Sequence, residues 1–167
     1  VYIAGETDDG VAVFTRDAAT GGLTFVEVKK DGLGGVDGLN GVRALAFSDD
    51  GLHLYAAGAL DNAVAVFARD AETGALTFVE AEIDGANGAD GLAGASGVAV
   101  SPDGEHVYVS GETDSAIAVL ARNPLTGALT PQPAGFDGVG GLDGLQGVMA
   151  VVVSPDGSLG RLPFATL

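Results

Sequence analysis

The sequence has no cysteine and no tryptophan, and only 7 of its 167 residues are lysine or arginine. The absence of cysteine excludes disulfides and thiolate metal sites, and it leaves the cellular compartment undecided because a core of this size needs no cross-links. Long hydrophobic runs are also missing: none approaches the roughly 20 apolar residues of a membrane-spanning helix. The first residues, Val1–Ala4, are typical of a strand and lack the basic and apolar pattern of a secretory leader.

The scarcity of positive charge bears on the partners of the protein. Against the 7 basic residues stand 23 acidic ones, which gives a formal net charge of −16. A surface of this sign repels a phosphate backbone, so we expect no nucleic-acid partner, and an anionic membrane surface is disfavoured for the same reason. Cations are the small partners that this charge favours. The alternative is an acidic surface that serves only solubility.

What the sequence has in abundance is glycine, with 28 residues, and an internal repeat. The turn-like motif Ser48–Gly51 recurs as Ser101–Gly104 and Ser154–Gly157, each time 53 residues further on. A second motif keeps the same period, as Val11–Phe14, Val64–Phe67 and Ile117–Leu120. Because no insertion interrupts the period, we interpret the chain as one structural unit copied in tandem.

Each repeat contains four short apolar or β-branched segments separated by glycine, proline, aspartate and asparagine. In the second copy these segments are Val42–Phe47, Leu52–Ala57, Ala63–Arg69 and Leu76–Ala81. Four antiparallel strands in a unit of about 40–50 residues are typical of a β-propeller blade. The sequence therefore predicts an all-β fold, with about three four-stranded blades built from the 53-residue repeat.

Residues 1–167 form a single repeat region in this interpretation, with first strands starting near residues 42, 97 and 149 and partial blades at both ends. Three blades are too few to close a ring, since propellers have about four to eight blades. We therefore expect an arc of a larger propeller of about seven blades. The expected partners are further blades or, as the alternative, a second copy of the chain.

The glycine-rich linkers between blades are candidate cation sites, because hard cations such as calcium prefer clustered carboxylates and carbonyls. The first linker is Asp31–Leu39, with close copies starting at Asp84 and Asp137. The candidate calcium ligands are Asp31, Asp37, Asp84, Asp90, Asp137 and Asp143. Their spacing fits neither an EF-hand nor tandem calcium nonapeptides, so a purely structural role of the linkers stays open. No other cofactor is expected.

The histidines and several arginines follow the repeat and so favour structural roles. His53 and His106 stand at equivalent positions, directly after the turn motif. An arginine ends the third strand of every copy, as Arg16, Arg69 and Arg122. We expect these arginines to pair with acids of the adjoining turns, such as Asp17 and Asp70.

The stretches Gly97–Val109 and Ala116–Thr130 resemble the repeats of lactonase-type propellers, a family that includes 6-phosphogluconolactonase and YVTN-repeat proteins. The resemblance implies an Arg-His pair at the start of a first strand, facing a central pocket and handling a sugar lactone. The matching positions hold Arg43-Ala44, Ser96-Gly97 and Met149-Ala150, so Arg43 alone fits. Arg43 is the candidate for positioning a substrate.

Two functions remain after this reading. The first is a non-catalytic binding or scaffold module of a larger acidic protein, whose ligand is an unidentified protein or small molecule and whose location is secreted or at the cell surface. The second is a fragment of a lactonase-like hydrolase that acts on a sugar lactone. The missing histidine favours the first, and the family resemblance supports the second.

Overall fold

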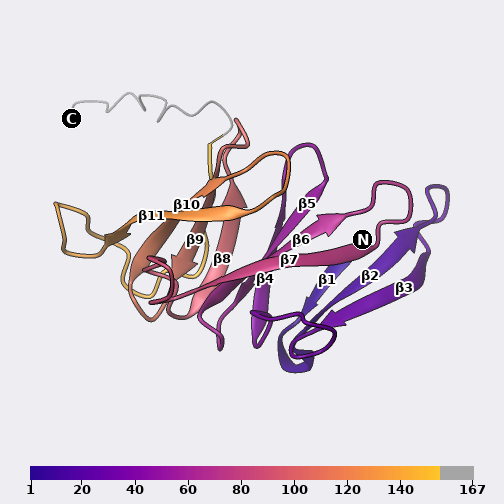
Figure 1. The fold of residues 1–167 in the computed structure, drawn as a ribbon, viewed down its shortest axis with the longest axis horizontal. Helices are drawn as coiled ribbons and strands as arrows, with labels where there is room; N and C mark the ends of the chain where they lie inside the picture. Colours follow the sequence, from indigo (N-terminus) through magenta and orange to yellow (C-terminus); the bar gives the residue numbers. More distant parts are fainter. Residues whose placement is uncertain (155–167) are drawn as a thin grey trace, which may run out of the picture.

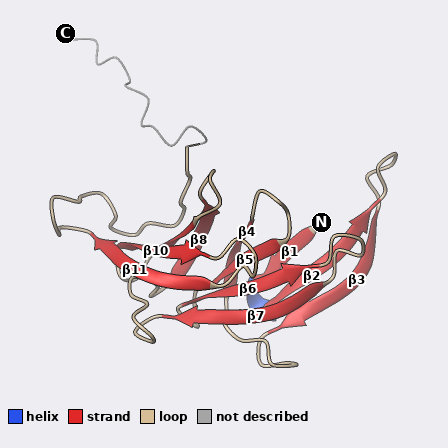
Figure 2. Cartoon of the chain, turned by 45° about the horizontal axis from the view of Figure 1, so that its top comes forward, coloured by secondary structure: helices blue, strands red, loops and turns tan. Residues whose placement is uncertain are grey.

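The computed structural model describes residues 1–154, which form three antiparallel sheets that lie side by side (Figure 1). The first sheet comprises β1 (Tyr2–Gly5), β2 (Gly10–Arg16) and β3 (Leu23–Lys30). The second comprises β4 (Val42–Phe47), β5 (His53–Gly58), β6 (Ala63–Arg69) and β7 (Leu76–Ile83). The third comprises β8 (Ala95–Val100), β9 (His106–Gly111), β10 (Ala116–Arg122) and β11 (Leu129–Phe136). The all-β prediction is confirmed; the short 3-10 turn η1 (Glu6–Asp8) is the one helical element of the described part (Figure 2).

In each sheet, strands that follow one another in the chain pair antiparallel, in the orders β1-β2-β3, β4-β5-β6-β7 and β8-β9-β10-β11. These are the blades that the repeat predicts, and β4 and β6 have the predicted bounds. The pairing of the third and fourth strands has one register shift in each blade, which lies between Val66 and Phe67 in the second blade. The first blade has it at the equivalent place, between Val13 and Phe14, whereas in the third blade the shift lies earlier in the strand, between Ile117 and Val119.

The fourth strand of each blade is its outer edge. In the third blade this strand, β11, contains Pro131 and Pro133. A proline has no N–H to donate to a neighbouring strand, so it is tolerated at an edge and disfavoured in a central strand. The edge position of β11 therefore explains how two prolines fit into this blade.

The core lies between successive blades. Between the first and second blades, Val11 and Val13 of β2 belong to one buried cluster with Leu54 and Phe67. Between the second and third, Tyr55, Val64 and Val66 pack with residues of the third blade, including Val107, Val109 and Leu120. Fully burying one such side chain stabilises a fold by about 1.5–3 kcal/mol, so each blade depends on its neighbours for its stability.

The residues after the third linker lie against the inner strand β8. The Ser96 hydroxyl donates to the Val148 carbonyl over 3.1 Å, and a Cβ at Gly97 would come within 2.8 Å of Ala150 Cα. Residues 148–154 form no strand. In the second and third blades, the inner strands β4 and β8 each pair with the second strand of their own blade. The segment that would pair in this way with residues 148–154 lies outside the described residues.

Within residues 1–154, no helix is long and apolar enough to cross a membrane.

Candidate functional site

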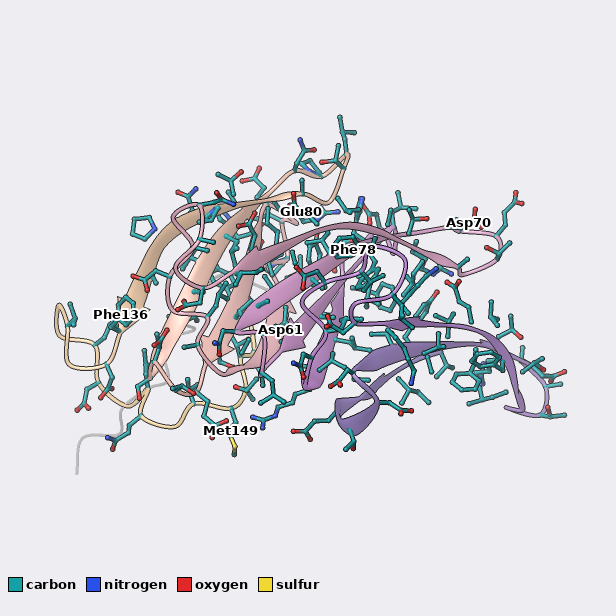
Figure 3. The ribbon with its side chains drawn as sticks, turned by 60° about the horizontal axis from the view of Figure 1, so that its bottom comes forward. Asp61, Asp70, Phe78, Glu80, Phe136 and Met149 are labelled. Atoms are coloured by element: carbon teal, nitrogen blue, oxygen red, sulfur yellow. The ribbon has the colours of Figure 1, made fainter. Side chains whose placement is uncertain are left out.

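One rim of the arc brings together the linkers and the loops between second and third strands. The Asp61 carboxylate, in the loop before β6, accepts from the backbone N–H of Asn40 in the first linker over 2.9 Å. Asp114 makes the same contact with Ala93 in the second linker, over 3.1 Å. Figure 3 shows Asp61 and Asp70 at opposite ends of β6, which separates this rim from the rim of the turn motifs. The linker rim therefore holds the candidate site residues.

Arg43 lies on this rim at the start of the inner strand β4. It lines a hollow of about 330 Å³ together with Glu6, Ser96, Glu112 and Met149. Arg43, Ser96 and Met149 occupy one repeat position in three successive units, so the hollow is lined by the inner position of each blade. The candidate from the sequence thus lines a hollow on this rim.

The guanidinium of Arg43 is held by two carboxylates from the two neighbouring blades. Its Nε lies 3.0 Å from Glu6 Oε1, and its Nη1 lies 3.0 Å from Glu112 Oε2. Glu6 belongs to η1 of the first blade, and Glu112 directly follows β9 of the third. One arginine therefore links three blades across the pocket.

Sequence reasoning identified Arg43 and missed its two partners. Glu6 and Glu112 stand at the same repeat position, two periods apart, with Ala59 between them. The signal was present in this alternation of acid, alanine and acid around one arginine. Its meaning depends on the distance across the inner rim, which no spacing in the chain reveals.

The pocket has the groups for polar chemistry on an ester or lactone. A guanidinium can polarise a carbonyl oxygen and stabilise the charge that develops on it. A carboxylate in reach of water can act as a general base. One guanidinium against two carboxylates leaves the pocket negatively charged, which disfavours an anionic ligand. At the position after Arg43, where the family resemblance implies a histidine, this chain has Ala44.

A larger open groove, of about 660 Å³, runs between β3, the first linker and the start of β7. It is lined by Lys29 and Lys30, which would suit an anion. Both ammonium groups already have partners, since Lys29 lies 2.9 Å from Glu27 and Lys30 lies 3.4 Å from Asp8. The Arg43 guanidinium is paired as well, so its pocket is the better candidate because of its place, where one repeat position of three successive units meets.

The calcium candidates gather in two clusters on the same rim. Ligand oxygens of Asp31, Asp37 and Asp61 lie within 4.8 Å of one another, and so do those of Asp84, Asp90 and Asp114. Asp61 and Asp114 were not among the predicted ligands. The third linker has Asp137 and Asp143, but the position one repeat after Asp114 holds Leu167.

Each linker also uses its first aspartate for its own fold. Asp31 accepts from the N–H of Leu39 over 3.0 Å, and Asp84 accepts from Leu92 over 2.9 Å. Asp137 repeats this with Leu145 over 2.8 Å. A loop closed in this way, between residues eight positions apart, explains why the aspartate recurs without any ion.

The calcium hypothesis stays a prediction, and it has a direct test. Calcium that binds only the folded chain raises its stability by about 2.7 kcal/mol at a concentration one hundred times its dissociation constant. The hypothesis predicts that the melting temperature of the protein is higher in calcium than in chelator. The rise should shrink in the double variant Asp61→Asn, Asp114→Asn. Equal melting temperatures in both buffers would contradict calcium binding, and the aspartates would then have only their contacts to the backbone.

On the opposite rim, the arginines do not pair with the acids of their own turns, and that expectation was wrong. Arg69 Nε donates to the hydroxyl of Tyr2 over 2.7 Å, and Arg122 Nε donates to Tyr55 over the same distance. We call these two contacts the Tyr–Arg clamps. Asp70 accepts instead from backbone N–H groups of its turn. A long arginine side chain at the end of a third strand reaches the preceding blade more readily than its own tight turn.

The second clamp is buried and has further partners. Arg122 Nη2 lies 2.9 Å from His53 Nδ1, and because arginine only donates, this nitrogen of His53 accepts. Burial, together with the charge of Arg122, lowers the pKa of His53, so the ring stays neutral. His53 thus serves the junction between two blades, as its repetition in the sequence indicated.

A third contact joins the outer strands of neighbouring blades. Glu27 accepts from the N–H of Leu76 over 2.6 Å, and Glu80, on β7 beside Phe78 (Figure 3), accepts from Leu129 over the same distance.

Lys29 neutralises Glu27, but the equivalent of Lys29 in the second blade is Glu82. One Glu82 oxygen is buried without a hydrogen-bond partner in the described part of the structure. Burial, and then the charge of Glu80, raises the pKa of Glu82.

We expect Glu82→Gln to stabilise the protein at pH 7 by on the order of 1 kcal/mol, because it removes an unpartnered charge from a partly buried site. A raised pKa in the folded state means that stability falls as pH rises from the unfolded value of 4.5 through the folded value. The gain should therefore vanish in acid, below that value. Urea unfolding of both proteins across this pH range measures it.

The control for this prediction is Glu72→Gln, at an exposed turn. Any lost negative charge relieves some repulsion in a chain of net charge −16. A gain of equal size in the control would show that Glu82 has no special role.

Comparisons with known proteins bear on the whole arc. The profile of a family described as "Lactonase, 7-bladed beta-propeller" matches residues 33–134. No match was found among curated proteins.

Among solved structures, the chain is similar to a periplasmic gluconolactonase of Pseudomonas aeruginosa, with 27% identity and a TM-score of 0.69 over 81% of this chain and 36% of that one. It is also similar to a protein of Bacteroides fragilis described as a candidate 6-phosphogluconolactonase, with 26% identity and a TM-score of 0.65 over 78% of this chain and 33% of that one. A Lactobacillus plantarum protein shares the fold, with 22% identity and a TM-score of 0.68, over 89% of this chain and 40% of that one. The chain thus spans little more than a third of the length of the solved structures that it matches.

Proposed function

The chain belongs to the lactonase family of seven-bladed β-propellers, and from this premise we propose that it forms part of a lactonase-like hydrolase acting on a sugar lactone. The observation that carries the proposal is the Arg43 pocket on the linker rim, where three inner-strand positions meet. The similarity to a gluconolactonase at 27% identity supports the same activity.

In the proposed reaction, Arg43 donates hydrogen bonds to the lactone carbonyl oxygen. A neighbouring carboxylate, Glu6 or Glu112, takes a proton from water as the water oxygen attacks the carbonyl carbon. The tetrahedral oxyanion is stabilised by the guanidinium, and the bond from the carbonyl carbon to the ring oxygen then breaks. The ring oxygen takes up the proton, and the product is the open hydroxy acid.

The charge of the pocket favours an uncharged lactone over a phosphorylated one. Two nitrogens of Arg43, Nε and Nη1, are already matched by carboxylates at 3.0 Å. A phosphate group brings about −1.5 to −2 charges into a site that is negative before it binds. We propose an uncharged sugar lactone as the substrate.

The test is hydrolysis of glucono-δ-lactone by the purified chain, followed by acid release above the spontaneous rate. Arg43→Ala should abolish the catalysed part, because the variant loses the only cation among the described residues that line the pocket. Lys30→Gln, a cation outside this pocket, is the matched control and should keep it. Hydrolysis that is unchanged in Arg43→Ala contradicts the proposal.

The other candidate is a non-catalytic binding or scaffold module, which the observation on Ala44 favours. The position that would carry the family's histidine has no titratable group in any of the three copies. A chain that binds glucono-δ-lactone without hydrolysing it would fit this function. Similarity to a periplasmic protein supports a location outside the cytoplasm for either function.

A further inference from the structure

Two of the four asparagines of this chain are followed by glycine, as Asn40-Gly41 and Asn87-Gly88. In such a pair the backbone nitrogen of the glycine can attack the side-chain amide carbon of the asparagine, because glycine has no Cβ to hinder the approach. A cyclic succinimide forms and ammonia leaves. Water then opens the ring. Opening at the side-chain carbonyl gives aspartate, and opening at the backbone carbonyl gives isoaspartate, in which the chain runs through the side chain.

The structure restrains the first pair, Asn40-Gly41. The N–H of Gly41, which would have to attack, donates to the carboxylate of Asp9 over 2.8 Å, and the negative charge there opposes the loss of its proton. The carbonyl of Asn40 accepts from Leu60 over 3.0 Å, and that of Gly41 accepts from Ala59 over 3.1 Å. Gly41 is also buried, and a Cβ there would lie 2.7 Å from Leu60 Cγ. This pair is therefore fixed against the loop that follows β5, and its nitrogen already has an acceptor.

The second pair, Asn87-Gly88, lies in the linker between β7 and β8 and has none of these restraints (Figure 1). Both residues are exposed. Within residues 1–154, neither makes a hydrogen bond through its backbone, and the Asn87 side chain makes none either. A Cβ at Gly88 would meet no atom within 4 Å. The attacking N–H and the amide are thus both free, and no hydrogen bond opposes the rotation that brings them together.

The rest of this linker is held by its own hydrogen bonds. The N–H of Gly85 donates to the carbonyl of Ala89 over 2.9 Å, and the N–H of Ala89 donates to Ala86 over 2.8 Å. Asp84 closes the longer loop by accepting from Leu92. A change confined to the reactive pair therefore breaks none of the bonds that join the second blade to the third.

We propose that Asn87 is a site of spontaneous deamidation, through attack of the Gly88 nitrogen on its side-chain amide. The co-reactant is water and the leaving group is ammonia, and the reaction needs neither an enzyme nor an oxidant. The product carries one more negative charge, in the linker where Asp84, Asp90 and Asp114 already place carboxylate oxygens within 4.8 Å of one another. The modification makes the linker rim more acidic between the second and third blades.

The repeat supplies a variant that blocks the reaction and suits the linker. The position of Asn87 holds Gly34 in the first linker and Gly140 in the third. All three residues have a left-handed backbone, with φ of 51° at Asn87, 64° at Gly34 and 62° at Gly140. Asn87→Gly therefore removes the amide and places a residue there that the same backbone accepts.

The experiment incubates the full folded chain in mildly alkaline buffer and follows both asparagines by peptide mapping with mass spectrometry. We expect Asn87 to be converted faster than Asn40 by about tenfold or more, because Asn40 reacts only after the charged hydrogen bond of Gly41 is broken. The product at Asn87 should separate into two isomers of equal mass, aspartate and isoaspartate, since direct hydrolysis of the amide gives aspartate alone. In Asn87→Gly, the acidic form of the protein should be absent from ion-exchange chromatography.

Two controls test whether the fold causes the difference. In guanidinium chloride, where the chain is unfolded, both pairs should react at similar rates. Asp9→Ser frees the N–H of Gly41 and should speed the conversion of Asn40 in the folded chain. Serine suits this position, since Ser115 stands there in the third blade with the same φ of 51°, and circular dichroism checks that the variant is folded. Equal rates at Asn40 and Asn87 in the folded wild-type chain overturn the proposal, and so does a product at Asn87 that contains aspartate alone.

Discussion

Gly111→Ala is expected to lower the free energy of unfolding by about 3 kcal/mol, a large share of the roughly 5–15 kcal/mol of a natural domain. A Cβ at Gly111 would lie 2.3 Å from the carbonyl oxygen of Gly91 and 3.0 Å from its carbon. Both are backbone atoms of the linker that leads from the second blade to the third, so no side chain can turn aside. The linker must move away from the end of β9, and the two blades separate.

The matched control is Gly5→Ala, at the same repeat position in the first blade. There the nearest atom to a new Cβ is Asp8 Cβ at 3.4 Å, which is an ordinary contact. Gly5 has an extended φ of −112°, so alanine fits its backbone. Chemical denaturation of both variants measures the difference. Equal losses at Gly5 and Gly111 would mean that the close approach of the linker has no energetic weight.

Arg122→Leu should cost about 3 kcal/mol of stability, because it removes a buried cation that has four partners. The guanidinium donates to Tyr55, to the Gly104 carbonyl over 2.9 Å and to His53, and lies 3.4 Å from Asp50. Leucine satisfies none of these groups. The Tyr55 hydroxyl keeps its bond to Gly127, but the Gly104 carbonyl and the neutral ring of His53 lose theirs.

Arg16→Leu is the control, since it changes the same residue type at the same repeat position on an exposed surface. Its expected effect is within about 0.5 kcal/mol. Thermal or urea unfolding of both variants gives the two values. A loss at Arg122 no greater than that at Arg16 would show that the Tyr–Arg clamp adds nothing to the junction.

The strands and turns were predictable from the sequence because their causes are local. Apolar segments alternate with residues that favour turns, and the period of 53 fixes where each segment recurs. The structure places β4 and β6 at the expected residues, and it moves the bounds of β5 and β7 by one or two residues. The position of Arg43 on an inner strand also followed, because the family resemblance rests on the same repeat.

The surroundings of each repeated residue could not be predicted, because they come from another part of the chain. The atoms that a Cβ at Gly111 would meet belong to Gly91, in a linker that precedes the strand β8. The expected pairing of Arg69 with Asp70 used the nearest acid in the chain, whereas its partner Tyr2 stands 67 residues away.

By itself, the sequence determined a repeated four-stranded blade, an excess of acidic residues and one arginine in the place of the family's pocket residue. The tertiary structure alone decided that Glu6 and Glu112 hold Arg43, and that Arg122 is buried against Tyr55 of the preceding blade. Local preferences act within a few residues, so a pattern can reveal them. Contacts between blades depend on which copies are neighbours in space, and identical copies acquire different roles only after they are packed.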